Sequence, residues 1–144
     1  MNTLYRFIFS AAPSGRNYST LILILRILFG LLLMWHGVLK WANYDNLTHA
    51  FPDPLGLGGH VSLLLVIFAE LFCSIFFMFG FFYRIVLIPM IFSMSIAFFV
   101  IHGGSIVQGG ELAFTYLAMF LILFFSGPGR ISFDYIIFSH YLKK

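Results

Sequence analysis

Long apolar stretches, separated by short polar ones, run along most of the chain. Four apolar segments stand out, and they cover residues 20–39, 61–82, 85–101 and 112–126. A helix that crosses a bilayer needs about 20 apolar residues, within a range of roughly 17–25. The first three segments meet this length, and the shorter fourth one either borrows Gly109–Glu111 or thins the bilayer locally. The pattern therefore predicts an all-α membrane protein, a bundle of four transmembrane helices.

The polar stretches divide the rest of the chain into loops and terminal segments of a single membrane domain, residues 1–144. They are an N-terminal segment 1–19, the loops 40–60 and 102–111, and an amphipathic tail 127–144. Within the first loop, Phe51–His60 is rich in proline and glycine, which predicts an ordered turn or a re-entrant lid.

Each terminus is predicted to carry a short interfacial segment. Near the N-terminus, Leu4–Ser10 is aromatic and contains a basic residue. After the fourth span, Gly127-Pro128-Gly129 ends the helix, because proline cannot continue it and glycine suits its C-terminal cap. Ser132 is then placed to cap a final helix, with Asp134 in its first turn.

Composition supports a bilayer environment and excludes some functions. The chain is 61% hydrophobic and 9% charged, whereas soluble domains have about 25% charged residues. The net charge is +3, but the basic residues are scattered and do not form the clustered surface that nucleic-acid binding needs. Cys73 is the single cysteine, so thiol–disulfide chemistry within the chain is excluded.

Lysine and arginine are distributed unequally between the two sides of the predicted bundle. The side richer in these residues faces the cytoplasm in most membrane proteins. One side carries Arg6, Arg16, Arg84, Arg130, Lys143 and Lys144, and the other carries Lys40. This asymmetry predicts that both termini are cytoplasmic and that the loops 40–60 and 102–111 face outward.

Two charged residues fall well inside the predicted spans. From a rise of about 1.5 Å per residue, Arg26 lies about 9 Å, and Glu70 about 18 Å, from the cytoplasmic side. An unpaired charge in the hydrocarbon is costly, and an extended arginine side chain covers most of the difference in depth. We therefore expect a buried ion pair between Arg26 and Glu70. Such a pair either marks a functional site or only fixes how the helices pack.

A second polar group is predicted at the outer end of the bundle. His36, Lys40, His102 and Glu111 come from different spans but lie within about one or two helical turns of the outer interface. Together they predict a partly wet vestibule that binds the polar head of a ligand. The alternative is that the histidines only anchor the helices at the lipid headgroups. Their spacing matches no metal or haem ligand motif, so no metal site is assigned.

The order of several residues is similar to that of a known family. In chain order they are Arg26, Gly37-x-x-Lys40, Pro54-x-Gly56, Glu70, Gly80, Arg84, Glu111 and Gly127-Pro128-Gly129-Arg130-x-Ser132-x-Asp134. In this set the chain resembles the DoxX family of small bacterial membrane proteins, and the terminal string is the most specific part of the resemblance. The resemblance implies a four-helix protein of the bacterial inner membrane, often assigned to redox functions. A related subunit belongs to a thiosulfate:quinone oxidoreductase.

The expected function follows from the resemblance and from the polar residues. We expect a membrane subunit that binds quinone, or a similar lipophilic substrate, between its helices. His36, Lys40 and His102 would donate hydrogen bonds, and Glu70 and Glu111 are a candidate proton relay; no residue is assigned as catalytic. The sequence has no flavin, nicotinamide or iron–sulfur motif, so electrons would come from a partner oxidoreductase. The alternatives are a non-catalytic scaffold or assembly factor and a small-solute or metal-handling membrane protein.

Overall fold

A computed structural model describes residues 15–142 of the chain, and the predicted segment Leu4–Ser10 lies outside these residues. The first span is α2 (Arg16–Ala42), which is followed by the short helix α3 (Tyr44–Thr48). The second span consists of α4 (Gly59–Ile67), η1 (Phe68–Phe72) and α5 (Cys73–Phe79). The third span consists of α6 (Tyr83–Ser95) and η2 (Ile96–Ile101), and the fourth consists of η3 (Ile106–Gly110) and α7 (Glu111–Ser126). The last helix is α8 (Phe133–Leu142).

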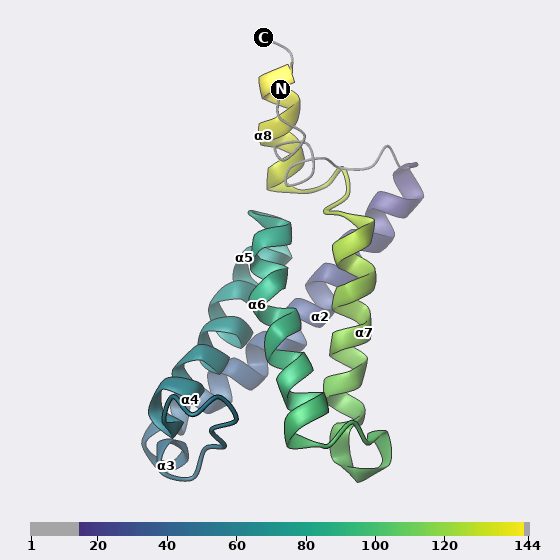
Figure 1. Cartoon of the computed structure of the whole chain (residues 1–144). Coiled ribbons are helices and arrows are strands. Elements are labelled where there is room, and N and C mark those ends of the chain that lie inside the picture. Colours follow the sequence, from purple (N-terminus) through teal and green to yellow (C-terminus); the bar gives the residue numbers. More distant parts are fainter. Residues whose placement is uncertain (1–14, 143–144) are drawn as a thin grey trace.

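The predicted fold class is confirmed. Four helical stretches in the described part of the chain are long and apolar enough to cross a membrane. They pack side by side, and α2 crosses behind the others (Figure 1). The first span is longer than its apolar segment, since it begins at Arg16 and ends at Ala42. The sequence did not predict α3 within the loop 40–60.

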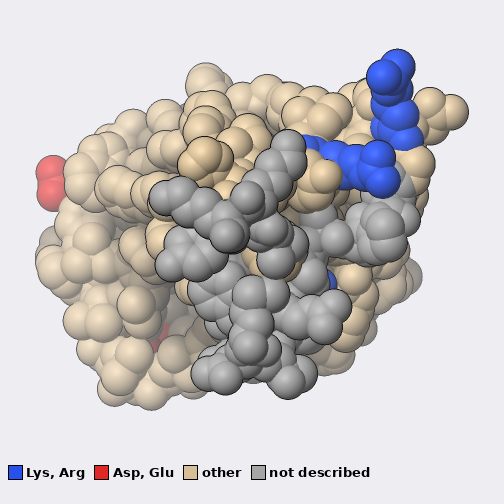
Figure 2. Space-filling model, turned by 90° about the horizontal axis from the view of Figure 1, so that it is seen from above, with Lys and Arg blue, Asp and Glu red and all other residues tan. Residues whose placement is uncertain are grey.

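The two ends of the bundle differ in what they contain. One end, here called the N/C end, holds the start of α2, the turn between α5 and α6, and the segment from Gly127 to α8, which projects away from the bundle (Figure 1). The opposite end, called the loop end, holds residues 43–58 and 102–110. Viewed from the N/C end, basic side chains of the described residues gather toward one edge of the visible face (Figure 2).

Aromatic side chains form much of the buried core. Phe77 of α5 is fully buried and stacks on Tyr83 of α6, with ring centroids 5.5 Å apart. Phe77 also packs against Phe120 of α7, whose ring meets it edge-on with centroids 5.6 Å apart. Large apolar side chains also remain exposed along the spans, among them Trp35 of α2 and Phe92 of α6. That outward apolar surface is what contact with lipid tails requires.

The connection between the second and third spans is a tight turn at Gly80. Tyr83 and Arg84, which the apolar pattern suggested as the connection, are the first residues of α6. Gly80 has a left-handed backbone (φ 66°), and the amide of Phe81 donates to the carbonyl of Phe76. This is the Schellman arrangement that ends many helices at glycine. A Cβ atom on Gly80 would lie 2.7 Å from Nη2 of Arg26, so the position also needs glycine for space.

Gly37 brings α2 into direct contact with the backbone of the second span. A Cβ atom there would lie 2.8 Å from the amide nitrogen of Leu71 and 3.0 Å from the carbonyl carbon of Glu70. These are backbone atoms of η1, so they cannot move aside as a flexible side chain does. Lys40 lies one helical turn after Gly37, and this close approach lets it reach Glu70.

Replacing Gly37 with alanine should therefore push α2 away from η1. We expect a loss of about 1–3 kcal/mol in the free energy of unfolding, the usual cost of overpacking, despite the better helix propensity of alanine. The measurement is denaturant unfolding in detergent micelles, followed by circular dichroism. Gly15→Ala is the matched control, because no atom of the described residues lies within 4 Å of a Cβ at Gly15. Equal stability of the two variants would show that the helices do not need this contact.

Candidate functional site

Arg26 is buried at the N/C end, with 1% of its surface exposed. Its guanidinium donates hydrogen bonds to backbone carbonyls from two parts of the chain. Nε and Nη2 donate to Phe77 and Met78 at distances of 3.2 and 2.7 Å, and Nη1 donates to Pro128 and Ile131 at 2.7 and 2.9 Å. The guanidinium also lies over the ring of Tyr83, 5.7 Å from its centroid. Arg26 thus connects the end of α5, the start of α6 and the segment after α7.

The predicted ion pair between Arg26 and Glu70 is wrong. Among the described residues, the salt bridge of Glu70 is with Lys40, and Arg26 has carbonyl oxygens as its acceptors. The physical reason is that the last carbonyls of a helix have no partner within it. Where α5 ends, these carbonyls offer a buried guanidinium several acceptors close to its own depth. Glu70 lies about two helical turns further into the bundle, where Lys40 arrives from the opposite end of α2.

Asp134 completes the arrangement at the N/C end. It is fully buried, and its carboxylate accepts hydrogen bonds from the amides of Phe82 and Tyr83, at 2.9 and 2.8 Å. The backbone amide of Asp134 donates to the carbonyl of Gly80. The side chain therefore caps α6, a helix distant in sequence, instead of its own helix α8. We call Arg26, Gly80, Tyr83, Ser132 and Asp134 the Arg26 cluster.

Ser132 caps α8 as the sequence predicted. Its hydroxyl accepts a hydrogen bond from the amide of Tyr135 and donates to the carbonyl of Gly129. The hydroxyl of Tyr83, which the sequence analysis did not single out, donates to the carbonyl of Leu123 near the end of α7. The hydrogen bonds of the Arg26 cluster thus join helix ends, and its arrangement is that of a structural centre.

The second group of polar residues lies at the loop end, around Glu70. Nζ of Lys40 lies 2.5 Å from Oε2 of Glu70, and their side chains are 26% and 6% exposed. Glu70 lies in η1, where the helix is wound as a π-helix. Such segments are rare and occur often at functional sites, because the extra residue in the turn shifts a side chain out of the regular register. His36 is within electrostatic reach of Glu70.

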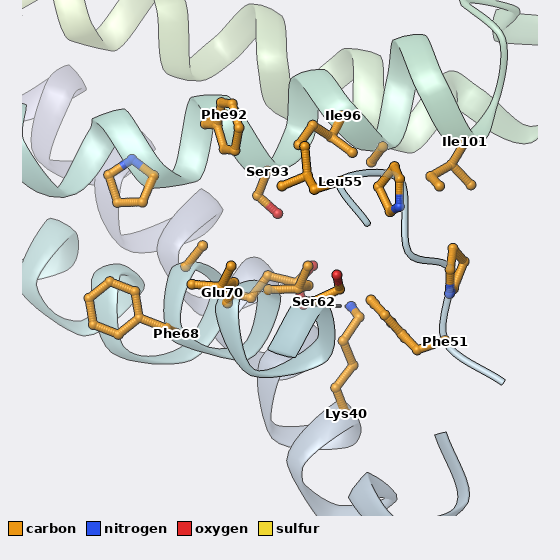
Figure 3. A pocket seen from close by; sticks show the side chains of 17 residues that line it. Lys40, Phe51, Leu55, Ser62, Phe68, Glu70, Phe92, Ser93, Ile96 and Ile101 are labelled. Carbon is orange, nitrogen blue, oxygen red and sulfur yellow. Dashed lines mark hydrogen bonds and ion pairs between the residues drawn. The ribbon is translucent and has the colours of Figure 1, made fainter. Parts of the chain in front are cut away.

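A cavity of about 410 Å³ opens beside the Lys40–Glu70 pair. One wall is formed by α4 and η1, the other by α6 and η2, and residues of the loop after α3 close one end (Figure 3). The lining is mostly apolar, and the side chains shown in Figure 3 include Phe51, Leu55, Phe68, Phe92, Ile96 and Ile101. Its volume falls within the range of about 300–1,000 Å³ that is typical of small-molecule sites. Lys40 and Glu70 are the charged residues of the lining.

Asp53 holds the loop that closes the cavity. Its carboxylate accepts hydrogen bonds from the amides of Leu57 and Gly58 and from the hydroxyl of Ser62, which itself lines the cavity. The Ser62 hydroxyl, followed by the Gly58 amide, lowers the pKa of Asp53 below its usual value. The carboxylate is therefore ionised at neutral pH and keeps all of these hydrogen bonds. The segment predicted as a turn or a re-entrant lid is an ordered turn that contributes Phe51 and Leu55 to the lining.

The four residues predicted to form a vestibule are not gathered at this cavity. Lys40 lines it, whereas His36, His102 and Glu111 do not. The ring of His36 meets Tyr116 of α7 edge-on, with centroids 6.3 Å apart. His102 lies at the end of η2, and Glu111 is exposed at the start of α7. Of the four residues, the cavity thus includes only Lys40 in its lining.

Most of the lining could not have been found by searching for polar residues. Phe51, Phe68, Phe92 and Ile96 are apolar residues among many others, and nothing in their sequence distinguishes them from lipid-facing ones. One signal was available in the loop, where Pro52 and Pro54 precede a run of glycines. Such a segment has restricted conformations and was expected to be ordered.

The fold and these two polar groups define the class of protein to which the chain belongs. It is an integral membrane protein with four apolar spans. A buried arginine joins helix ends at the N/C end, and a cavity lies between the helices near the loop end. The sequence model of the DoxX family matches residues 21–103, and the chain belongs to this family. The match contains Arg26, Gly37, Lys40, Glu70 and Gly80, and it ends before the terminal Gly127–Asp134 string. No curated protein and no solved structure matches the chain.

Proposed function

We propose that this DoxX protein binds a quinone, or a similar lipophilic molecule, in the cavity between α4–η1 and α6–η2. The observation that carries the proposal is the combination of a mostly apolar lining with one polar end, where Lys40 pairs with Glu70. A quinone has the same division, with a carbonyl-bearing head and an apolar tail. The apolar walls suit the ring and the tail, and the Lys40 ammonium can donate a hydrogen bond to a carbonyl oxygen.

Glu70 has a second proposed role, in supplying protons. Reduction of a quinone to the quinol takes two electrons and two protons, and the protons end on the carbonyl oxygens. Glu70 stands next to Lys40, and His36 and Tyr116 lie within electrostatic reach of Glu70 without lining the cavity. These groups form the proposed proton path. The electrons would come from a partner oxidoreductase, in keeping with the redox functions that the family resemblance implies.

The proposal also includes an orientation. We place the N/C end in the cytoplasm because Arg16, Arg84 and Arg130 lie at this end, whereas Lys40 lies toward the loop end. The cavity then lies near the outer face of the bacterial inner membrane. Both chain ends described here lie at the same end of the bundle, so a single reporter fused after Lys144 tests the orientation of the whole protein.

Filling the cavity should remove the ligand without unfolding the protein. Ala97 of η2 lines the cavity, and Ala97→Trp places an indole ring in the space that the ligand would occupy. We expect at least about a tenfold loss of bound quinone, which corresponds to about 1.4 kcal/mol of binding free energy. The protein is purified in mild detergent, supplied with a short-tailed quinone and extracted for chromatography, while thermal unfolding is followed in parallel.

Two sets of variants sharpen the result. Val107→Trp is the matched control, because Val107 is 96% exposed and does not line the cavity. His102→Ala and Glu111→Gln test the vestibule, and loss of quinone in these variants with retention in Ala97→Trp would move the site there. If the wild-type protein retains no quinone at all, the scaffold function becomes the better proposal.

A further inference from the structure

The charges at the polar end of the cavity balance within the protein. Lys40 and Glu70 are the charged residues of the lining, and they are paired with each other. The remaining polar side chains of the lining are the hydroxyl groups of Ser62 and Ser93. The hydroxyl of Ser62 already donates to Asp53. A ligand that enters the cavity therefore meets a polar end with no net charge.

The two members of the pair are not equally accessible. The Lys40 side chain is 26% exposed and that of Glu70 is 6% exposed, so the ammonium is the group that a ligand head can reach. An ammonium has three donors and no acceptor. One donor is directed at Glu70, and the others can serve an acceptor oxygen of a ligand. A carbonyl or a hydroxyl group fulfils this requirement without bringing a charge.

A carboxylate head would be rejected here. It would compete with Glu70 for a single ammonium and place two negative charges around one positive charge. In surroundings of low polarity such repulsion is weakly screened, and like-charged groups that share a site oppose each other's ionisation. His36 is also within electrostatic reach of Glu70, but it does not line the cavity, so Lys40 is the cation that a ligand head meets there.

We propose that the Lys40–Glu70 pair makes the cavity selective for lipophilic molecules with an uncharged oxygen-bearing head over fatty acids, and that Glu70 is the residue that determines this choice. The inference rests on the proposed function only in that the cavity binds a lipophilic ligand. Without the Glu70 charge, Lys40 would become an unpaired cation at the end of an apolar cavity. That arrangement is suited to a fatty-acid carboxylate.

The test compares two probes that share a twelve-carbon chain, one with an uncharged hydroxyl head and one with a carboxylate head. The purified full-length protein is placed in phosphatidylcholine nanodiscs at about pH 8, well above the ordinary pKa of a carboxyl group. Dodecanol or dodecanoate is then added, and bound probe is measured by mass spectrometry after subtraction of empty nanodiscs. We expect the wild-type protein to bind dodecanol at least about tenfold more tightly than dodecanoate. A difference of this size corresponds to the loss of one hydrogen bond to a charged group. Glu70→Gln should raise the affinity for dodecanoate by at least about tenfold.

The controls assign the effect to the pair. Asp45→Asn makes the same chemical change at an exposed position of α3 that does not line the cavity, so it should leave the preference unchanged. Adding Lys40→Met to Glu70→Gln should abolish the gain for dodecanoate. Equal binding of the two probes by the wild-type protein would overturn the selectivity, and this comparison needs no variant to fold. An unchanged affinity of a folded Glu70→Gln for dodecanoate would overturn the role of Glu70.

The outcomes also separate this inference from the proposed function. If dodecanol binds with the expected preference but the short-tailed quinone does not, the selectivity stands and quinone is the wrong ligand. If the quinone binds but dodecanoate binds as well as dodecanol, the proposed function stands and the selectivity is refuted.

Discussion

Arg26→Met should destabilise the protein by about 3–5 kcal/mol, the range expected when a buried charged group is removed from its partners. Four carbonyl oxygens, of Phe77, Met78, Pro128 and Ile131, lose their donor at once. Methionine keeps much of the apolar stem of the side chain, so the loss measures hydrogen bonds more than packing. Unfolding by a denaturing detergent, followed by circular dichroism, provides the free energy.

A double-mutant cycle distinguishes the partners of Arg26. Losses from Arg26→Met and Glu70→Gln should add to within about 0.5 kcal/mol, because the two residues share no partner among the described contacts. Arg16→Met serves as the control, since Arg16 is exposed and its replacement should change stability by no more than about 0.5 kcal/mol. A coupling energy above about 1 kcal/mol between Arg26 and Glu70 would restore the ion pair that the structure rejects.

Asp134→Ala should cost about 2–4 kcal/mol, because two amides at the start of α6 lose a buried acceptor. Besides the loss of global stability, we expect the start of α6 to open locally. The amides of Phe82 and Tyr83 should exchange with solvent faster than in the wild-type protein, which hydrogen–deuterium exchange with peptide resolution measures. Asp134→Asn retains one acceptor oxygen and should lie between the alanine variant and the wild type.

The control for Asp134 is another aspartate in the first turn of a helix. Asp45 is exposed in the short helix α3, so Asp45→Ala should change stability by no more than about 0.5 kcal/mol. Unchanged exchange at Phe82 and Tyr83 in Asp134→Ala would show that the α8 segment does not cap α6. Asp134 would then lack the structural role in the Arg26 cluster that its contacts indicate.

The two polar groups lie toward opposite ends of the bundle and make different kinds of contact. At the N/C end, the donors of Arg26 and the carboxylate of Asp134 are directed at backbone groups, which leaves this end as a fixed joint between spans. At the loop end, Lys40 is partly exposed beside a cavity, and π-helical segments form part of both walls. A site that must admit a ligand is better placed where helices deviate from regular geometry than where they are fastened together.

The sequence by itself determined the class of this protein, its spans and the residues that matter in them. Length and apolarity predict four membrane helices because an apolar stretch of about 20 residues crosses the bilayer as a helix, which satisfies its backbone hydrogen bonds within the segment. Glycine and proline positions located the loop before α4 and the end of α7, and Ser132 was correctly placed as the cap of α8. The same reasoning singled out Arg26 and Glu70, since charges inside apolar spans are costly and therefore conspicuous. Lys40 was predicted as part of the polar group at the outer end.

Only the tertiary structure decided which of these residues meet. Depth and opposite charge favoured Arg26 with Glu70, but depth is a single coordinate, and it says nothing of the direction in which a side chain projects. It also ignores backbone carbonyls, which every sequence contains and which proved to be the acceptors for Arg26. The close approach at Gly37 then brought Lys40 to Glu70. The cavity beside them lies between α4–η1 and α6–η2. The distance between these two walls is set by the packing of segments that are far apart in the sequence.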